Sequence, residues 1–188
     1  PTAFGKFTTA MFSSVTSRTA GFNTVDMAHF TIPGILFMIF LMWIGASPAS
    51  TGGGIKTSTF ALATLNVFSI ARNKKYIEIG TRRIAAEAVQ RAFAIISISL
   101  AAVGMGILLL LIFNPEFSLL QIAFEAFSAI GTVGLSMGIT AKLSIFSKYV
   151  IIGLMFFGRI GLLNLMIGLL KSVEKTNYTY PQENILIN

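Results

Sequence analysis

The 188-residue sequence lacks cysteine entirely and contains one histidine and few charged side chains. Without cysteine, no disulfide, thiolate metal site or cysteine nucleophile can form. Charged residues make up 11% of the chain, less than half of the about 25% that is usual in soluble domains. The sequence contains no paired-carboxylate arrangement, no Ser-His-Asp set and no cluster of metal ligands. His29 has no partners for a metal site, and we interpret it as interfacial. Nothing in the sequence supports an enzyme, and no cofactor or resident metal is expected.

Long apolar segments dominate the composition instead. Hydrophobic residues make up 54% of the chain, and the mean hydropathy is +0.79. Residues 92–113 and 149–170 are apolar runs of membrane-spanning length. The 17 glycines suit close packing between membrane helices. These features predict an all-α integral membrane protein.

The net charge of +7 raises the possibility of a nucleic-acid partner, but the basic residues are not distributed for one. Five of them gather between two apolar runs: Arg72, Lys74, Lys75, Arg82 and Arg83. Such a cluster usually marks the cytoplasmic side of a membrane protein, although a lipid or partner site there stays open. We predict no nucleic-acid partner, a cytoplasmic linker with a surface helix over 72–91, and a cytoplasmic tail over 172–188.

Residues 30–71 form an apolar stretch that a single helix cannot explain. Such a helix would be about 63 Å long, roughly twice the hydrocarbon thickness of a bilayer. Pro48 and three consecutive glycines, residues 52–54, break it. We predict an outer helix over 30–44, a loop over 45–55 and an inner helix over 56–71.

The loop over 45–55 has three interpretations. It superficially resembles a nucleotide-binding P-loop, but Ile55 separates the last glycine from Lys56 and no strand precedes it. A passive kink needs fewer small and polar residues. A mobile gate inside the membrane fits better, and its candidate residues are Gly45, Ser47, Ser50, Thr51, Gly52, Gly53 and Gly54.

Two Thr-x-Gly segments, residues 19–21 and 132–134, lie 113 positions apart and form a duplicated pattern. Each follows an apolar stretch too short to span a membrane, residues 4–17 and 119–130, and precedes a longer apolar run. Loop backbone at membrane depth survives only where protein buries it or where it lines a cavity. A glycine contact between helices would explain one such segment, but the duplication favours an ion filter lined by backbone carbonyls. The filter candidates are Thr19, Ala20, Gly21, Phe22, Thr132, Val133, Gly134 and Leu135.

Arg159 lies in the middle of an apolar run, where a charge costs at least about 2.5–3.5 kcal/mol. It follows Gly134 by 25 positions, the interval that separates Gly21 from Ala46. This places Arg159 at the depth of the loop, where its guanidinium is expected to donate to loop carbonyls and to repel cations when the gate is shut. The alternative is an arginine that only ties two helices together.

Charged residues near the filter segments are less informative. Arg18 could brace the first segment against Glu125, and an ordinary salt bridge at the outer rim, with Asp26 nearby, is an equal alternative.

These motifs together resemble the Trk/Ktr/HKT superfamily of potassium transporters. Residues 14–24 resemble its third filter region, residues 45–57 its gate loop, residues 131–136 its fourth filter region and residues 158–161 its fourth inner helix. The tail, which ends in Ile185-Leu186-Ile187, is similar to the KtrB membrane subunits of the bacterial Ktr system.

The resemblance implies four pseudo-symmetric helix–pore loop–helix repeats around one pore. Residues 1–71 would be the third repeat without its first helix, with a filter at 19–23, and residues 92–171 the fourth repeat, with its filter at 131–136. Because the chain opens with Pro1 and lacks that first helix, we expect a piece of a longer protein. The resemblance further implies a homodimer in the bacterial plasma membrane and a cytosolic, nucleotide-binding regulatory ring of the KtrA type.

Two other functions stay open. Broken helices also hold substrates in ion-coupled secondary transporters. In this chain the substrate site would then lie at residues 45–55. The loops could instead only scaffold a structural or receptor subunit. Gly21 and Gly134 favour potassium by resemblance, but the sequence does not decide between potassium and sodium.

Overall fold

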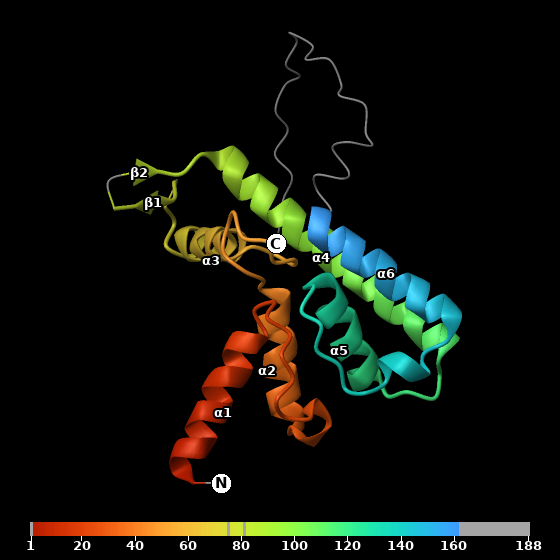
Figure 1. Ribbon diagram of the computed structural model, residues 1–188. Helices are drawn as coiled ribbons and strands as arrows, with labels where there is room; N and C mark the ends of the chain where they lie inside the picture. The colour runs from red at the N-terminus through yellow and green to blue at the C-terminus, as the bar shows by residue number, and fades with distance from the viewer. Residues whose placement is uncertain (1, 75, 81, 162–188) are drawn as a thin grey trace.

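The computed structural model describes residues 2–74, 76–80 and 82–161, and these are mostly helical (Figure 1). The predicted tail over 172–188 and the last part of the predicted helix over 149–170 lie outside the described residues. Within the described part, one helix is long and apolar enough to cross a membrane, Ala86–Phe113.

The first half of the chain contains three helices. They are α1 (Ala3–Thr16), α2 (Ile32–Trp43) and α3 (Thr57–Ala71), with a short 3₁₀ helix, η1 (Met27–His29), before α2. Thr2 caps α1 by accepting a hydrogen bond from the Gly5 amide at 3.3 Å. Pro33 stands in the first turn of α2, where its missing N–H costs nothing. These helices lie within two residues of the segments expected from the apolar pattern.

The second half contains α4 (Ala86–Phe113), α5 (Leu119–Ile130), a 3₁₀ helix η2 (Thr140–Lys142) and α6 (Ile145–Ile160). A capping box of Ser118 and Gln121 begins α5. Helices α4 and α6 begin six and four residues before the apolar runs that predicted them, because the helical backbone continues into flanking polar turns where apolar content gives no signal.

The surface helix expected over 72–91 is wrong for its first part. Strands β1 (Glu78–Ile79) and β2 (Arg82–Arg83) pair as a small antiparallel hairpin. Gly80 adopts φ +60° at the turn, a conformation that favours tight hairpins. The Arg83 guanidinium lies 3.1 Å from the centre of the Tyr76 ring. This contact between the two arms of the turn suits a hairpin, and within 72–91 only residues from 86 onward are helical.

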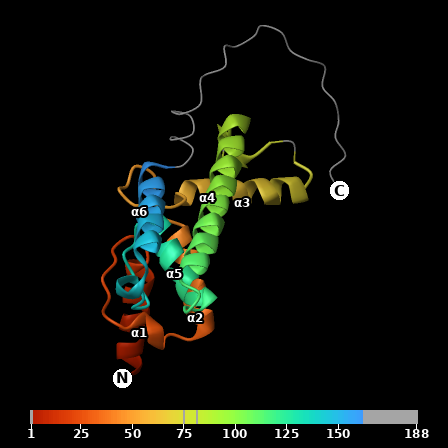
Figure 2. The same cartoon turned by 90° about the vertical axis from the view of Figure 1, so that its right-hand side faces the viewer.

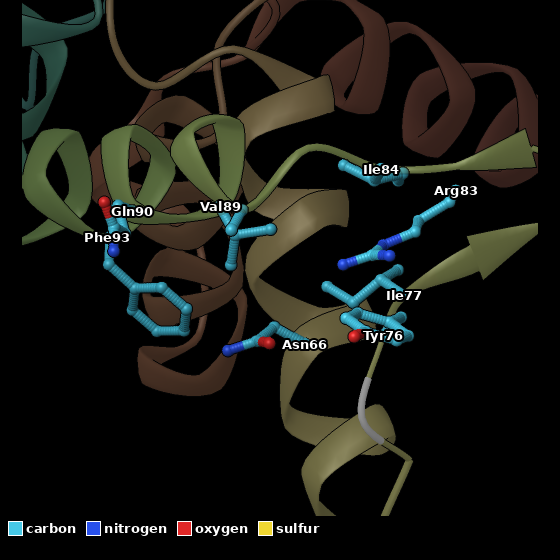
Figure 3. A pocket seen from close by; sticks show the side chains of 9 residues that line it. Asn66, Tyr76, Ile77, Arg83, Ile84, Val89, Gln90 and Phe93 are labelled. Atoms are coloured by element: carbon cyan, nitrogen blue, oxygen red, sulfur yellow. The ribbon is translucent and has the colours of Figure 1, made fainter.

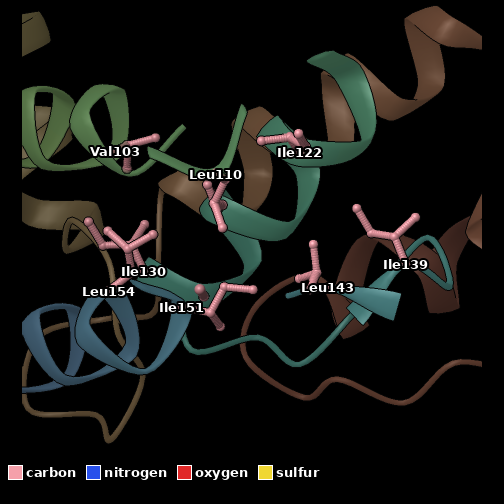
Figure 4. Close-up of a cluster of buried hydrophobic side chains, with 10 residues drawn as sticks. Val103, Leu110, Ile122, Ile130, Ile139, Leu143, Ile151 and Leu154 are labelled. Atoms are coloured by element: carbon pink, nitrogen blue, oxygen red, sulfur yellow. The ribbon is translucent and has the colours of Figure 1, made fainter. Parts of the chain in front are cut away.

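Helix α5 is the centre of the packing. One face meets α4 and α6 in a cluster that includes Val103, Leu110, Ile122 and Leu154 (Figure 4). A second cluster joins Phe124 of α5 to Met38 and Met42 of α2. Helix α3 runs crosswise to α4 (Figure 2). The short helix α5 is therefore enclosed by α2, α4 and α6, with its C-terminal end deep inside the molecule.

Candidate functional site

The two Thr-x-Gly loops follow the C-terminal ends of α1 and α5 and share one backbone conformation. Thr19 and Thr132 have φ of 68° and 50°, and Gly21 and Gly134 have φ of 71° and 88°. Positive φ is uncommon for a residue with a side chain and is a genuine outlier for a β-branched one. Strained backbone of this kind clusters at functional sites, and here it occurs at equivalent positions of the duplicated segment.

Side-chain hydroxyls hold both loops in this shape. Thr16 Oγ1 donates to the carbonyl oxygen of Phe22 at 2.8 Å, and Ser128 Oγ donates to that of Leu135 at 2.6 Å. In both repeats the hydroxyl comes from the end of the short helix and the acceptor follows the loop glycine. A carbonyl oxygen has two lone pairs, so each acceptor retains one for another partner.

The two loops lie against each other. A Cβ added to Gly21 would lie 2.1 Å from the Val133 carbonyl oxygen, so no other residue fits without movement. Val133 and Leu135 are buried, whereas Gly134 between them is exposed and has open space where a Cβ would be. The second loop thus buries the side chains of Val133 and Leu135, and its backbone is exposed at Gly134.

A glycine-rich loop over 44–56 separates α2 from α3, as the sequence predicted. Its two ends are joined by hydrogen bonds from the Gly45 amide to the Ile55 carbonyl at 2.7 Å and from the Ile55 amide to the Trp43 carbonyl at 3.2 Å. A Cβ on Gly45 would lie 2.0 Å from the Gly53 carbonyl oxygen. The loop is therefore a tightly folded unit, closed by its own backbone hydrogen bonds.

The glycines of this loop contact both Thr-x-Gly loops. A Cβ on Gly52 would lie 2.9 Å from Thr19 Oγ1, and one on Gly53 would lie 2.7 Å from Thr132 Oγ1. The Gly53 amide donates to Thr132 Oγ1 at 2.9 Å, and the Gly54 amide donates to the Ile130 carbonyl at 3.0 Å. Both glycines 52 and 53 are buried, so this loop closes directly on the pair of threonines.

Two cationic side chains bind the carbonyls of the glycine-rich loop. Arg159 Nη1 donates to the Thr51 carbonyl oxygen, and Lys56 Nζ donates to the carbonyls of Gly52 and, at 3.3 Å, Ser50. A Cβ on Gly158 would lie 1.9 Å from the Ile130 carbonyl. This close approach of α6 to the end of α5 places Arg159 beside the loop.

Lys56 was not among the residues selected from the sequence. A lysine at the start of an apolar run is itself a sign of function, but Lys56 entered the prediction only as part of the P-loop and gate-loop patterns. The remaining loop candidates, Ser47 and Ser50, form an exposed turn in which Ser50 Oγ donates to the Ser47 carbonyl at 2.6 Å.

The expected brace between Arg18 and Glu125 is absent from the described part of the chain. Glu125 is buried, with 5% of its surface exposed, and its carboxylate accepts from the hydroxyls of Ser136 and Thr140. Arg18 is exposed.

Across the described residues, no group of three or more His, Cys, Asp or Glu residues could hold a metal ion.

A cavity of about 490 Å³ lies away from these loops, between α3, the hairpin and the start of α4 (Figure 3). Asn66, Tyr76, Arg83 and Phe93 are among its lining residues. It contains none of the residues that the sequence selected for a filter or a gate.

A mostly helical fold that includes a helix of membrane-spanning length, Ala86–Phe113, fits the class of helical membrane proteins. Residues 2–179 match the TrkH family, described as a cation transport protein. The chain belongs to this TrkH family of membrane cation transporters.

Three curated relatives support this family membership. Potassium uptake protein B of the Ktr system is 42% identical over 185 residues in Vibrio alginolyticus, covering 98% of this chain and 40% of the relative. The protein of the same name from Bacillus subtilis is 41% identical, covering 96% and 40%. The potassium/sodium uptake protein NtpJ of Enterococcus hirae is 38% identical, covering 94% and 40%. The chain thus spans about 40% of the length of these relatives.

The fold matches a solved transporter. The crystal structure of the potassium transporter TrkH from Vibrio parahaemolyticus superposes with a TM-score of 0.68 at 26% identity, covering 90% of this chain and 38% of the other. The similarity to an all-α membrane transporter confirms the predicted fold class. The resemblance to KtrB is likewise confirmed by the relatives named above.

Proposed function

We propose that the chain forms part of a potassium translocation path, with Thr-x-Gly loops as filter segments and the glycine-rich loop as the gate beneath them. The observation that carries this proposal is the close approach of the glycine-rich loop to both threonines: the Gly53 amide donates to Thr132 Oγ1, and a Cβ on Gly52 would meet Thr19. A loop that touches both filter segments is placed to block an ion leaving them. The chain would then be most of the third and all of the fourth of four repeats.

Helix dipoles support a cationic substrate. Helices α1 and α5 end directly before the loops, so the partial negative charge of each C-terminus points at the place where an ion would lose its water. Backbone carbonyls replace such water in known filters. The named relatives transport potassium, or potassium and sodium, and we propose potassium as the principal ion.

Opening of the gate requires the loop to leave these contacts. In the described conformation Arg159 and Lys56 together bind three successive loop carbonyls, those of Ser50, Thr51 and Gly52. Their positive charges also oppose the passage of a cation. We propose that this is the closed state and that Arg159 acts as its latch.

The name of the relatives' Ktr system supports a multi-subunit assembly. We propose a homodimer in the bacterial plasma membrane with a cytosolic nucleotide-binding ring. The basic hairpin region and the tail would face that ring, in keeping with the excess of positive charge on cytoplasmic loops.

The substrate-binding alternative at the broken helix has weaker support. Gly52 and Gly53 approach Thr19 and Thr132 so closely that no room remains even for a Cβ, whereas a substrate site needs space. Potassium flux through the purified, reconstituted transporter with no organic substrate present would separate the two functions.

The proposal is tested with Gly134→Ser in the complete transporter, produced in bacteria that lack their own potassium uptake. Gly134 has φ +88° and open space around it, so serine would disturb the backbone rather than clash. We expect loss of potassium selectivity or uptake at normal protein levels in the membrane. Gly104→Ser, at a helical glycine with equally open space, and Gly80→Ser, at a positive-φ glycine of the hairpin, are the controls. Unchanged potassium transport in Gly134→Ser would contradict the filter.

A further inference from the structure

Glu125 is a buried acidic side chain that neither the filter nor the gate explains. Only 5% of its surface is exposed, and it lies on α5, behind the second Thr-x-Gly loop. Its two carboxylate oxygens each lie 3.0 Å from Thr140 Oγ1, and Ser136 Oγ donates to Oε1. A buried acidic group is costly unless it is hydrogen-bonded, so this arrangement has a specific structural role.

The hydrogen bonds connect Glu125 to the filter segment. Ser136 directly follows Leu135, whose carbonyl is bound by Ser128. Glu125 and Ser128 are three positions apart on α5 and share a face, so they hold two successive residues of the loop. Ser136 Oγ also accepts from the Gly138 amide at 2.9 Å, which extends the support to the turn that follows.

Packing alone does not fix this side of the loop. A cavity of about 80 Å³ lies between the loop, α5 and α6, and Glu125, Ser128, Gly134, Ser136 and Thr140 are among its lining residues. Because the loop borders open space on this side, the hydrogen bonds of Glu125 and Ser128 add to the hold that the buried side chains of Val133 and Leu135 give on the other.

The equivalent positions of the first loop hold neither a carboxylate nor a hydroxyl. The repeat offset that aligns Thr19 with Thr132 aligns Glu125 with Phe12, a side chain that is 40% exposed. It aligns Ser136 with Asn23 and Thr140 with Met27, which is buried in the apolar core. The two filter segments therefore share a backbone conformation but are supported by different chemistry.

We propose that Glu125 is a positioning residue that fixes the second filter loop through Ser136 and Thr140, and thereby sets the discrimination between potassium and sodium. This inference rests on the proposed filter function. Selectivity depends on the size of a carbonyl cage or on the number and field of its carbonyls, and a loop that moves more freely weakens either. Loss of the brace should therefore affect the ratio of the two ions more than the total flux.

The test compares uptake of potassium and of sodium by the complete transporter, reconstituted into vesicles, for the unchanged protein, Glu125→Gln and Thr140→Val. A hydrogen bond to a charged group contributes enough to change a ratio about tenfold, and we expect a reduction of that order in the potassium-to-sodium ratio for each variant. Glu116→Gln, at an exposed residue of the α4–α5 connection, should leave the ratio unchanged. Glu125→Asp, which keeps the carboxylate on a shorter stem, should lie between the unchanged protein and Glu125→Gln.

The outcomes separate this inference from the proposed function. An unchanged ratio in Thr140→Val, or a proportional decrease for both ions, would overturn the role of Glu125 while leaving the filter intact. If Glu125→Gln does not reach the membrane, Thr140→Val decides the matter, because Thr140 is exposed and valine has nearly the same shape. Absence of potassium uptake by the unchanged protein would instead refute the proposed function itself.

Discussion

The two Thr-x-Gly loops have the same backbone in different surroundings. In the first, Phe22 is 69% exposed, and helix α1 before it has exposed apolar residues such as Phe4 and Phe7. In the second, Leu135 is 1% exposed, and α5 is enclosed by α2, α4 and α6. The conformation that they share therefore arises from local causes: a glycine, and a hydroxyl at the end of the short helix that holds the carbonyl after it.

Substitution of the two loop glycines should have the largest effect and should separate local from tertiary causes. In Gly21→Ala the new Cβ would meet the Val133 carbonyl at 2.1 Å, whereas in Gly134→Ala it would meet nothing within 4 Å. We expect Gly134→Ala to cost about 1–2 kcal/mol through its positive φ alone, and Gly21→Ala to cost about 2–5 kcal/mol because overpacking is added. Thermal unfolding of the purified transporter and potassium uptake would measure both. Equal effects would show that the loops are not in contact.

Removal of the latch should have the next largest effect. Arg159 joins the glycine-rich loop to α6 across 108 positions of sequence, whereas Lys56 binds carbonyls only four and six positions away. Arg159→Gln should raise potassium flux by about tenfold, since a hydrogen bond from a charged group contributes about 1.5–3 kcal/mol. Lys56→Gln should raise it less, because the local loop conformation survives.

The control for these variants is Lys148→Gln. Lys148 also lies on α6 and donates to a backbone carbonyl, that of Ala141 at 3.3 Å, but it lies near the opposite end of the helix from Arg159. Its substitution should leave flux unchanged, and an Arg159→Gln flux equal to that of the unchanged transporter would assign Arg159 a purely structural role.

The two threonines should give the smallest effects and should sharpen the comparison. Thr132 Oγ1 accepts from the buried Gly53 amide, so Thr132→Val leaves that amide unsatisfied, at a cost of about 1–3 kcal/mol. Thr19 contacts Gly52 sterically, and Thr19→Val preserves that volume, with an expected change below about 0.5 kcal/mol. Flux through the closed transporter should rise only for Thr132→Val. A rise of similar size for Thr19→Val would mean that both threonines hold the gate in the same way.

Prediction from sequence was accurate where the signals are local. The limits of α1, α2, α3 and α5 follow from caps, proline and the Gly-rich break, which act within a few residues. The hairpin was missed because the spacing of Arg82, Arg83 and Glu87 also fits a helix, and the choice was decided by Gly80 and the contact of Tyr76 with Arg83.

The candidate site shows the same division. The repeat offset selected Gly21 and Gly134, which lie on the two Thr-x-Gly loops, and Arg159, which binds the glycine-rich loop. From the sequence, Arg18 could brace the first loop against Glu125 or form an ordinary salt bridge at the outer rim, but the chain brings Ser136 and Thr140 to Glu125 instead. Hydroxyl partners leave no mark in composition or periodicity, so only the packed structure reveals them.

The amino-acid sequence by itself determined the apolar helices, the short helices α1 and α5 and the positive-φ glycines after them, since each depends on neighbours along the chain. Tertiary structure alone decided that the three loops meet, because contacts such as that between Gly53 and Thr132 join residues 79 positions apart. Such contacts exist only after α2, α5 and α6 have packed and backbone atoms can approach where glycine leaves room for them.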